Sequence, residues 1–315
     1  MAILINDTSY IFTIGTSEPY SYDHMGITTE ATRHLICSIE GIYKILWSLG
    51  VYADYFLPSS KVEKGELRRY KVVFLPFPIA LSDRVAQRLR EFVEEGGILV
   101  SEACPRRFNE YGMANLSGFS PPLEEVFGVE EENVVMCREW GKLYRSPRPR
   151  YLGDITPPTV LNGIGLLRGL SIKGCFWLQT YKVKSATPIF SWGNKVCGVV
   201  SKFGKGRAYL IGTFFGHNPM VYEEDSVRDF IAYILGHAGI RSDKIGRLIR
   251  RRLISNDGEI HFLINTSTEP VREKMKISNF RLVYDLITQH TLELHEGVVK
   301  IEVKPLDIIG IVLEH

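Results

Sequence analysis

The segment YKVVFLPFPIALSDRVAQRLREFVEEGGILVSE, residues 70–102, indicates the fold of the first half of the chain. Its first apolar residues follow one another without interruption, as expected for a strand that is covered on both faces in a parallel sheet. Ser82 then stands where a helix N-cap is expected, and apolar residues recur at helical spacing as far as Val93. Gly96 and Gly97 end that helix before ILVSE resumes as a strand. This β-α-β pattern predicts a doubly wound sheet.

The same alternation of helix and strand continues on both sides of this segment. Residues 31–49 have helical apolar spacing and end at Gly50, and VYADYFL, residues 51–57, predicts a strand. Later, RAYLIGTFF, residues 207–215, predicts another strand, and the apolar stripe that begins at Val227 predicts a helix. These units support an α/β fold.

Two further regions have a different pattern of residues. Residues 134–200 consist of short aromatic and β-branched runs separated by Gly and Pro, and we expect a β-rich insertion with edge strands there. Beyond about residue 247, strand-like pieces, among them MKISNF (275–280) and LELHEGVVKIEV (292–303), alternate with turn signals such as Asn256-Asp257-Gly258, which predicts a small antiparallel β-sandwich. We therefore expect one domain over residues 1–245 and a second over residues 246–315.

Composition excludes several classes of protein. The chain has 315 residues and a formal net charge of +2, so it is not built mainly to coat nucleic acid or an anionic membrane. No apolar run is long enough to span a bilayer and the start lacks a signal-peptide pattern, so we expect a cytoplasmic protein. Its five cysteines are an odd number without a CxxC pair, which argues against a disulfide framework. The chain has only three glutamines but 38 basic and 36 acidic residues, and this composition favours a thermophilic source.

No cofactor or metal site is predicted. The sequence KFGKGRAYL contains Gly204-Lys205-Gly206 but lacks the spacing of a P-loop, so we interpret it as a tight hairpin turn. There is no GxGxxG sequence and no HExxH sequence, and the histidines are scattered. A group of aromatic residues could stack on a carbohydrate or pack at an interface: Trp140, Tyr144, Phe176, Trp177, Tyr181 and Trp192.

A nucleophile is the main catalytic alternative. Cys104 follows the strand ILVSE, while His217 and Glu223 follow the strand that ends in IGTFF, and this order resembles the class I glutamine amidotransferases. A nucleophile elbow needs small residues two places on either side, yet Glu102 and Arg106 stand there. The elbow is therefore badly formed, and a stand-alone Cys-dependent hydrolase is kept as an alternative beside a non-enzymatic carbohydrate-binding or oligomerisation protein.

Four stretches together resemble the non-catalytic half of the β-galactosidases of glycoside hydrolase family 42. They are residues 70–102, FNEYGMANLSGFSPPLEEVFGV (108–129), FGKGRAYLIGTFFG (203–216) with the helix that follows, and EIHFLINTSTEPV (259–271) with LVYDLIT (282–288) and the closing strand. The resemblance covers most of residues 30–315. It implies a flavodoxin-like or class I glutamine amidotransferase-like trimerisation domain, followed by a small β-sandwich domain.

Enzymes of that family carry their two catalytic glutamates in a TIM barrel that precedes these domains. A barrel needs at least about 200 residues, and only about 30 residues precede the region of resemblance, so we expect the barrel to be absent and no catalytic residue to be carried over. The resemblance therefore implies an accessory or assembly subunit. Its expected partners are a separate catalytic TIM-barrel chain and further copies in trimer-type contacts, with neither nucleic acid nor a membrane.

Loops that leave the carboxyl ends of the parallel strands are the places where this chain would reach an active site. We expect the following residues to form a binding surface or the rim of that site: Phe77, Glu102, Arg106, Arg107, Tyr111, Phe215, His217 and Asn218.

Overall fold

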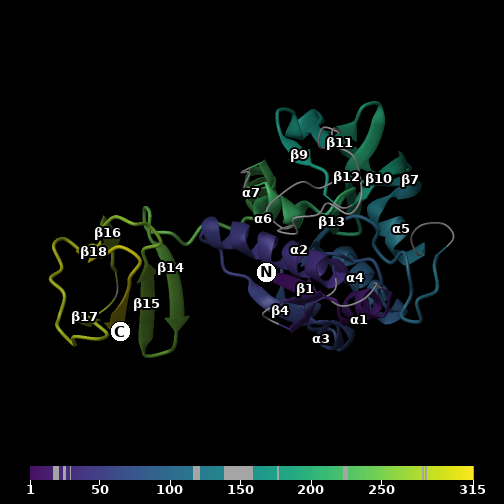
Figure 1. Ribbon diagram of the computed structural model, residues 1–315. Helices are drawn as coiled ribbons and strands as arrows, with labels where there is room; N and C mark the ends of the chain where they lie inside the picture. The colour runs from purple at the N-terminus through teal and green to yellow at the C-terminus, as the bar shows by residue number, and fades with distance from the viewer. Residues whose placement is uncertain are drawn as a thin grey trace. The chain divides into compact units, whose positions relative to one another are not determined.

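The computed structural model describes residues 1–16, 21–23, 26–28, 30–115, 121–137, 159–175, 177–222, 226–278, 280 and 282–314 (Figure 1). The contacts divide the chain into two units. Unit 1 consists of Met1–Ile45 and Ala53–Gly239, and unit 2 consists of Leu46–Tyr52 and Ile240–His315.

Unit 1 is a mixed α/β structure around one large sheet. Five parallel strands stand in the order β4 (Asp54–Pro58), β1 (Ala2–Ile5), β5 (Val72–Leu75), β6 (Ile98–Ser101) and β13 (Gly206–Ile211). Every residue of β5 and β6 is buried, which explains their unbroken apolar sequences. The predicted parallel sheet is therefore present.

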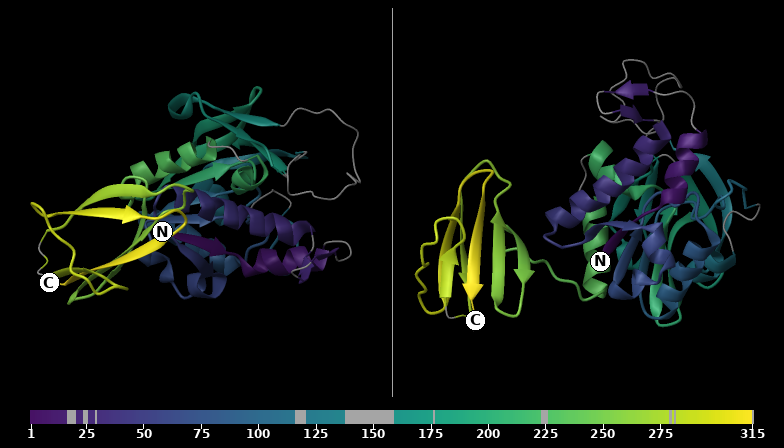
Figure 2. Two further views of the ribbon diagram at one scale, coloured as in Figure 1. Left: turned by 60° about the vertical axis from the view of Figure 1, so that its left-hand side comes forward. Right: turned by 90° about the horizontal axis from the view of Figure 1, so that it is seen from below.

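Helices cover this sheet (Figure 2). They are α1 (Asp7–Thr16), α2 (Glu30–Ser48), α3 (Ser59–Glu63), α4 (Asp83–Glu94), α5 (Pro121–Phe127), α6 (Asn218–Val221) and α7 (Ser226–His237), with 3-10 turns at Glu66–Arg69, Gly165–Leu167 and Phe215–His217. Helix α4 begins as predicted, because the Ser82 hydroxyl accepts a hydrogen bond from the N–H of Val85 at 3.2 Å.

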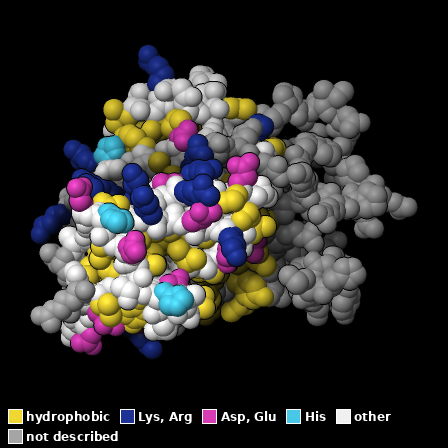
Figure 3. Space-filling view, turned by 90° about the vertical axis from the view of Figure 1, so that its left-hand side faces the viewer, with side chains coloured by type: hydrophobic (Ala, Val, Ile, Leu, Met, Phe, Trp, Pro, Cys, Tyr) yellow, Lys and Arg dark blue, Asp and Glu magenta, His cyan; other side chains and the backbone are white. Residues whose placement is uncertain are grey.

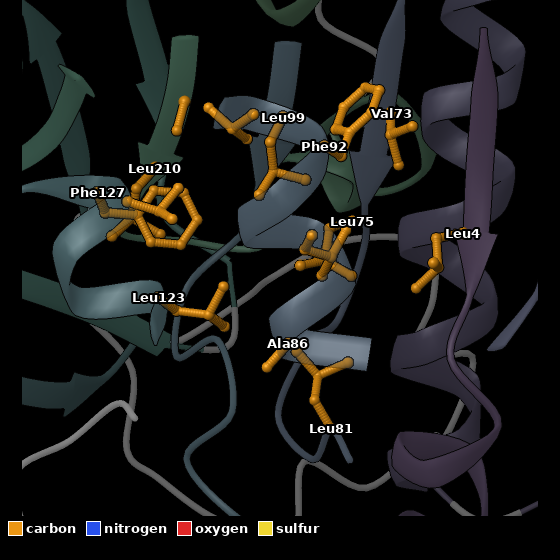
Figure 4. Packing of buried hydrophobic residues seen from close by; sticks show 14 of the residues in the cluster. Leu4, Val73, Leu75, Leu81, Ala86, Phe92, Leu99, Leu123, Phe127 and Leu210 are labelled. Carbon is orange, nitrogen blue, oxygen red and sulfur yellow. The ribbon is translucent and has the colours of Figure 1, made fainter. Parts of the chain in front are cut away.

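A single hydrophobic cluster joins α4 and α5 to the sheet. Figure 4 shows side chains from both helices and from β1, β5, β6 and β13 meeting in this cluster. Burial of such side chains contributes about 25 cal/mol for each Å² of apolar surface that is removed from water. The labelled members are Leu4, Val73, Leu75, Leu81, Ala86, Phe92, Leu99, Leu123, Phe127 and Leu210.

The region predicted as β-rich extends the same sheet with antiparallel strands. Beyond β13 lie β12 (Lys195–Phe203), β11 (Thr187–Trp192), β8 (Val160–Gly163) and β9 (Ser171–Lys173), while β10 (Trp177–Val183) pairs with β12 and with β7 (Val129–Met136). The strands that we expected in a β-rich insertion are thus part of the central sheet.

The KFGKGRAYL sequence forms the predicted hairpin between β12 and β13, with Phe203 paired to Gly206. Gly204 has a φ of 55°, and a Cβ atom there would lie 2.5 Å from the carbonyl oxygen of Glu94. Gly206 has a similar restriction, because its Cβ would lie 2.2 Å from the carbonyl oxygen of Val93. The two glycines are needed because this turn packs against the end of α4.

Unit 2 consists of two small antiparallel sheets. One has the order β14 (Ile249–Ile254), β15 (Gly258–Ile264), β19 (Ile308–Glu314) and β17 (Leu282–Asp285), and the other pairs β16 (Val271–Lys276) with β18 (Val298–Val303). Side chains of both sheets share one hydrophobic cluster, including Leu263, Val271, Val299 and Ile311. The turn predicted at Asn256-Asp257-Gly258 joins β14 to β15.

Two predicted strands of unit 2 have different bounds in the structure. MKISNF, residues 275–280, was expected to be a strand, but β16 ends at Lys276 because its partner strand begins opposite it at Val298. LELHEGVVKIEV, residues 292–303, is a strand only from Val298, because Glu296 and Gly297 have positive φ angles of 52° and 74° and form a turn.

The face drawn in Figure 3 mixes hydrophobic, basic, acidic and histidine side chains, and no charge of one sign dominates it. In the part of the chain that the structure describes, no helix is both long and apolar enough to cross a bilayer.

Candidate functional site

Glu102 is the centre of the loops at the carboxyl end of the parallel sheet. It follows β6 and is completely buried. Its carboxylate accepts hydrogen bonds from the Ser38 hydroxyl at 2.6 Å, from the N–H of Phe77 at 2.9 Å and from the N–H of Gly216 at 2.7 Å. Burial raises the pKa of this carboxyl group, while His217 and the three donors act in the opposite direction. Glu102 thus ties α2, the loop after β5 and the loop after β13 together.

The backbone at this end of the sheet is strained. Phe77, Cys104 and Arg106 have φ angles of 45°, 59° and 56°, a region that residues other than glycine seldom adopt. Such a conformation costs about 1–3 kcal/mol and persists only where the surroundings hold it. The N–H of Phe77 is held by Glu102, and the N–H of Cys104 donates to Gln179 Oε1 at 2.8 Å.

Gln179 belongs to a polar network that sequence reasoning missed. Its Nε2 donates to Glu131 Oε2 at 2.6 Å, and its Oε1 also accepts from the Tyr181 hydroxyl at 2.9 Å. Arg107 Nη1 donates to both Glu131 oxygens, at 3.0 and 2.8 Å. The network joins β7, β10 and the loop after β6. Only the antiparallel pairing of β7 with β10 brings Gln179 beside Glu131, so no local signal in the sequence could have revealed it.

Cys104 has the surroundings of a structural thiol. It is fully buried, and burial raises the pKa of its thiol well above the usual range, with the nearby Glu131 carboxylate acting in the same direction. Arg107 has a weaker opposing effect. Because the thiolate is the nucleophilic form, this environment counts against Cys104 as a catalytic residue. Glu223, the third member of the predicted arrangement, lies outside the described residues.

His217 and Asn218 lie inside the protein. His217 is buried in the 3-10 turn Phe215–His217, stacks on the Phe214 ring with centroids 5.8 Å apart, and lies near enough to Glu102 to influence its pKa. Asn218 is also buried, and its amide binds the backbone of Lys173 through a donated bond of 2.8 Å and an accepted bond of 3.2 Å. Both side chains hold loops together.

Arg106 fixes the loop between β5 and α4. Its guanidinium is almost completely buried, forms an ion pair with Asp83 and donates from Nε to the Leu81 carbonyl at 3.2 Å. Burial lowers the pKa of this guanidinium. Because Asp83 is the first residue of α4, the ion pair joins the loop after β6 to the start of that helix.

Tyr111 is the predicted rim residue that reaches solvent most fully, with 83% of its surface exposed. Asn109 shapes its loop, because the Asn109 Oδ1 atom accepts hydrogen bonds from the N–H groups of Tyr111 at 3.0 Å and Met113 at 2.9 Å. The Phe108 ring stacks on Phe12 of α1 with centroids 4.4 Å apart.

The predicted rim residues therefore fall into two groups. Arg107 is half-buried and Tyr111 is exposed, whereas the other six are buried in this chain: Phe77, Glu102, Arg106, Phe215, His217 and Asn218. The structure brings Phe77, Glu102 and His217 together and places Cys104 in the separate network around Glu131.

Other candidate binding features are weak. Of the aromatic group, Trp140, Tyr144 and Phe176 lie outside the described residues, Trp177 is half-buried, Tyr181 is buried, and Trp192 is exposed. Within the described ranges, no three His, Cys, Asp or Glu side chains are grouped so that they could hold a metal ion.

A surface pocket lies beside the residues that precede β5 and β6, at the other end of these strands from Glu102. Its charged side chains pair with one another, Arg68 with Glu95 at 3.0 Å and Arg88 with Glu91 at 2.7 Å. These pairs leave little charge in the pocket for a ligand.

Comparison with known proteins agrees with this architecture. Residues 20–146 match the family described as the β-galactosidase trimerisation domain. The β-galactosidase BglY of Alicyclobacillus acidocaldarius is 26% identical over 243 residues, which are 73% of this chain and 31% of that enzyme. The β-galactosidase LacA of Lactobacillus acidophilus is 23% identical over 85% of this chain and 36% of that enzyme.

Solved structures show the same fold over the full length of the chain. Gan42B, a GH42 β-galactosidase, aligns with a TM-score of 0.72 at 19% identity, covering 100% of this chain and 40% of that one. The β-galactosidase of Bacillus circulans sp. alkalophilus aligns with a TM-score of 0.70 at 16% identity, covering 100% of this chain and 41% of that one.

These matches define the class of protein as one with the fold of a non-catalytic part of a glycosidase. More specifically, residues 20–146 match the family model of the β-galactosidase trimerisation domain, and the chain is similar to the non-catalytic C-terminal part of the GH42 β-galactosidases, which confirms the resemblance found in the sequence. The chain spans 31% and 36% of the length of the two sequence relatives named above.

Proposed function

We propose that this chain is an accessory or assembly subunit of a β-galactosidase-like glycoside hydrolase and supports a separate catalytic TIM-barrel chain in carbohydrate breakdown. The observation that carries the proposal is the match of residues 20–146 to a trimerisation domain, in a chain that spans only part of its β-galactosidase relatives.

The interior of unit 1 supports this proposal. At the carboxyl end of a parallel sheet, where α/β enzymes place their ligands, the polar side chains of this chain bond to its own backbone and to one another. A glycosidase needs two accessible carboxyl groups on either side of its substrate, and Glu102 is buried. We therefore assign these residues a structural role.

We also propose a more specific fold for unit 1. In chain order the parallel strands of unit 1 are arranged 2-1-3-4-5, which is the flavodoxin-like order and supports a flavodoxin-like or amidotransferase-like domain. The division at residues 1–245 and 246–315 stays a prediction, as do the cytoplasmic location and the thermophilic source. The Cys-dependent hydrolase and the carbohydrate-binding protein remain alternatives with less support.

Hydrolysis of an aryl β-galactoside tests the proposal. We expect the purified full chain to release no aglycone above the buffer blank, because the catalytic carboxylates belong to the barrel. A Glu102→Gln variant serves as a control for contaminating enzyme, which would give the same rate in both preparations. Robust turnover by the purified chain that Glu102→Gln or Cys104→Ala abolishes, without loss of fold, would overturn the proposal.

A further inference from the structure

Unit 2 covers one edge of its four-stranded sheet and leaves the other open. Strands β17 and β14 stand at the two edges of this sheet. The chain itself covers β17, because the Leu292 N–H donates to the Val283 carbonyl at 2.8 Å. On the same side, the Asp285 N–H donates to the His290 carbonyl at 3.0 Å. Figure 1 shows β14 beside β15, and among the described residues no second segment pairs with β14.

The hydrogen-bond pattern of an antiparallel pair tells which backbone groups of β14 face the open edge. The Ser255 N–H donates to the Gly258 carbonyl at 2.9 Å, so these two residues form a pair of the hydrogen-bonded kind. Hydrogen-bonded and non-bonded pairs alternate from there along an unbroken register. Every second residue of β14 therefore directs its N–H and C=O groups away from β15. These residues are Arg250, Arg252 and Ile254.

Strand β14 lacks most of the features that protect an open edge. Proteins protect such edges by short strands, bulges, prolines or charged side chains. Strand β14 has six residues, no proline and no bulge in its register to β15. Its arginines are charged, but Leu253 and Ile254 are 60% and 64% exposed. Because these two apolar side chains point to opposite faces of the sheet, a strand added at this edge would contact both.

The neighbouring carboxylates only partly neutralise β14. Arg250 and Arg252 share one carboxylate, that of Asp243, and the Arg252 Nε atom lies 3.1 Å from it. Arg252 also lies 3.8 Å from the Glu259 carboxylate, which is already bonded to His261 at 2.6 Å. Two guanidinium groups thus compete for one close carboxylate.

Arg251 contributes a further positive charge to the same strand. Its guanidinium lies 4.5 Å from the centre of the Trp47 ring, which also belongs to unit 2. Its Nη1 atom donates to the Arg250 carbonyl at 2.9 Å. No carboxylate of the described residues forms an ion pair with this guanidinium. The β14 edge therefore combines open backbone groups, exposed apolar side chains and an excess of positive charge.

We propose that the β14 edge binds an extended acidic segment of another protein, which adds to the sheet as a further strand. The backbone of that segment bonds to the outward groups of β14, and its carboxylates lie opposite residues 250–252. Its apolar side chains lie opposite Leu253 and Ile254. A second copy of β14 does not fit, because antiparallel pairing with itself sets arginine opposite arginine. This inference goes beyond the proposed assembly function and requires no barrel chain.

Binding of a labelled peptide to the full chain tests the proposal. The probe carries fluorescein and has six residues, as β14 has, in the order Val-Val-Glu-Glu-Glu-Thr. We expect its fluorescence anisotropy to rise to saturation with added chain, whereas a peptide with lysine in place of each glutamate should show no rise. No binding of the acidic peptide at the highest soluble concentration of the chain would overturn the proposal.

A charge reversal on β14 shows whether the peptide binds at this edge. Arg251→Glu should raise the Kd at least about threefold, because like charges then stand opposite each other. Lys274→Glu is the matched control, since it makes the same change of charge at an exposed position on β16 of unit 2. An equal Kd for the two variants would place the peptide elsewhere and overturn the proposal.

Two variants at one position separate backbone pairing from side-chain contact. Ile254→Pro removes an outward N–H and leaves the bonds to β15 in place, whereas Ile254→Thr keeps that N–H. Both variants lose the isoleucine side chain, so we expect the proline variant to bind the peptide about threefold to tenfold more weakly than the threonine variant. Circular dichroism checks that both are folded. Equal Kd values for two folded variants would overturn strand addition.

Methylated peptides make the same test without changing the protein. The probe is prepared in two versions, each methylated at one of the two alternate sets of backbone amides. One version should lose binding and the other should keep it, because alternate residues of an added strand face β14. Equal binding of both versions would indicate recognition of charge alone and would overturn the proposal.

Light scattering of the chain without peptide tests the second copy as the occupant. We expect Ile254→Pro and Ile254→Thr to have the same mass in solution. An oligomer that the proline variant alone dissociates would show that β14 pairs with another copy, and it would overturn the proposal of an acidic partner.

Discussion

The cluster around Glu102 and the loop that carries Tyr111 and Met113 both follow strands at the carboxyl end of the parallel sheet, yet one buries polar side chains and the other exposes large apolar ones. Around Glu102, polar groups are buried and bond to the chain itself. A few residues later in the sequence, Tyr111 and Met113 are apolar and face solvent. An α/β enzyme would instead point a few polar groups from such loops into a concave, mostly apolar pocket. The comparison indicates that the polar groups at this end of the sheet hold its loops together.

The largest effect on stability is expected from Glu102→Ala. The change leaves the Ser38 hydroxyl and the N–H groups of Phe77 and Gly216 buried without their acceptor. Each unsatisfied group costs about 1–3 kcal/mol, so we expect the loss of acceptor for three groups to lower the free energy of unfolding by at least about 3 kcal/mol, measured by urea denaturation. Glu110→Ala, at an exposed position in the following loop, should change it by less than about 0.5 kcal/mol. A loss below about 1 kcal/mol for Glu102→Ala would remove the contrast between the two regions.

A smaller loss is expected from Gln179→Ala. This change removes the acceptor for the Cys104 N–H and the Tyr181 hydroxyl together with a donor to Glu131. Part of the network remains, because Arg107 still binds Glu131, so we expect a loss of about 2–3 kcal/mol in the same assay. Gln87→Ala, on the exposed side of α4, is the matched control. Equal stabilities of the two variants would show that the network contributes nothing.

The next largest effect is expected on the rate at which the cysteine thiols of the folded chain react. Burial raises the pKa of Cys104 and of Cys197, so both thiols should be protonated and shielded at neutral pH. We expect the folded chain to react with a disulfide reagent far more slowly at pH 7.5 than the urea-unfolded chain does. Rapid modification of one thiol in the wild type, absent in Cys104→Ala, would instead identify an activated Cys104 and favour the hydrolase alternative.

The smallest effect is expected on the pH dependence of stability, through His261 in unit 2. His261 is almost completely buried, and burial lowers its pKa below 6.5, although a hydrogen bond from Nε2 to Glu259 opposes this. Arg252 lies directly across the strand pair from His261, and Arg250 is near. The positive charges of both side chains disfavour the protonated form of His261. The unfolded chain therefore takes up the proton first, and stability that is present above pH 6.5 is lost as the pH falls below it.

A His261→Gln variant, compared with His290→Gln at an exposed position, measures that dependence. Urea denaturation between pH 8 and pH 5 should give a smaller decline for His261→Gln than for the wild type, with His290→Gln following the wild type. A parallel decline in all three proteins would show that His261 does not titrate differently in the folded state.

Local sequence patterns predicted the regular elements well where they were long. The helix that Ser82 caps and the buried strands β5 and β6 follow directly from apolar spacing and turn residues. Strand β1 was missed although it lies between β4 and β5, because the four residues Ala2–Ile5 are too few to show a period. The hairpin of β2 (Ser21–Asp23) and β3 (Gly26–Thr28) was missed for the same reason.

The candidate site was predicted only in part. The sequence placed Glu102, Phe77 and His217 at one end of the sheet, because loops after parallel strands meet there. It could not show that they are buried, since Ser38 of α2 and Gly216 complete the bonds to Glu102 from 64 and 114 residues away. Burial of a loop residue depends on such distant contacts, which spacing along the chain does not record.

The most direct test of the proposed assembly function is gentle affinity purification of the tagged full chain from its native host, followed by mass spectrometry of the intact eluted complex. We predict a TIM-barrel glycosidase in a whole-number ratio to this chain, and aryl β-galactosidase activity that elutes with the complex. Recovery of this chain alone, with no glycosidase at stoichiometric level, would contradict the proposal.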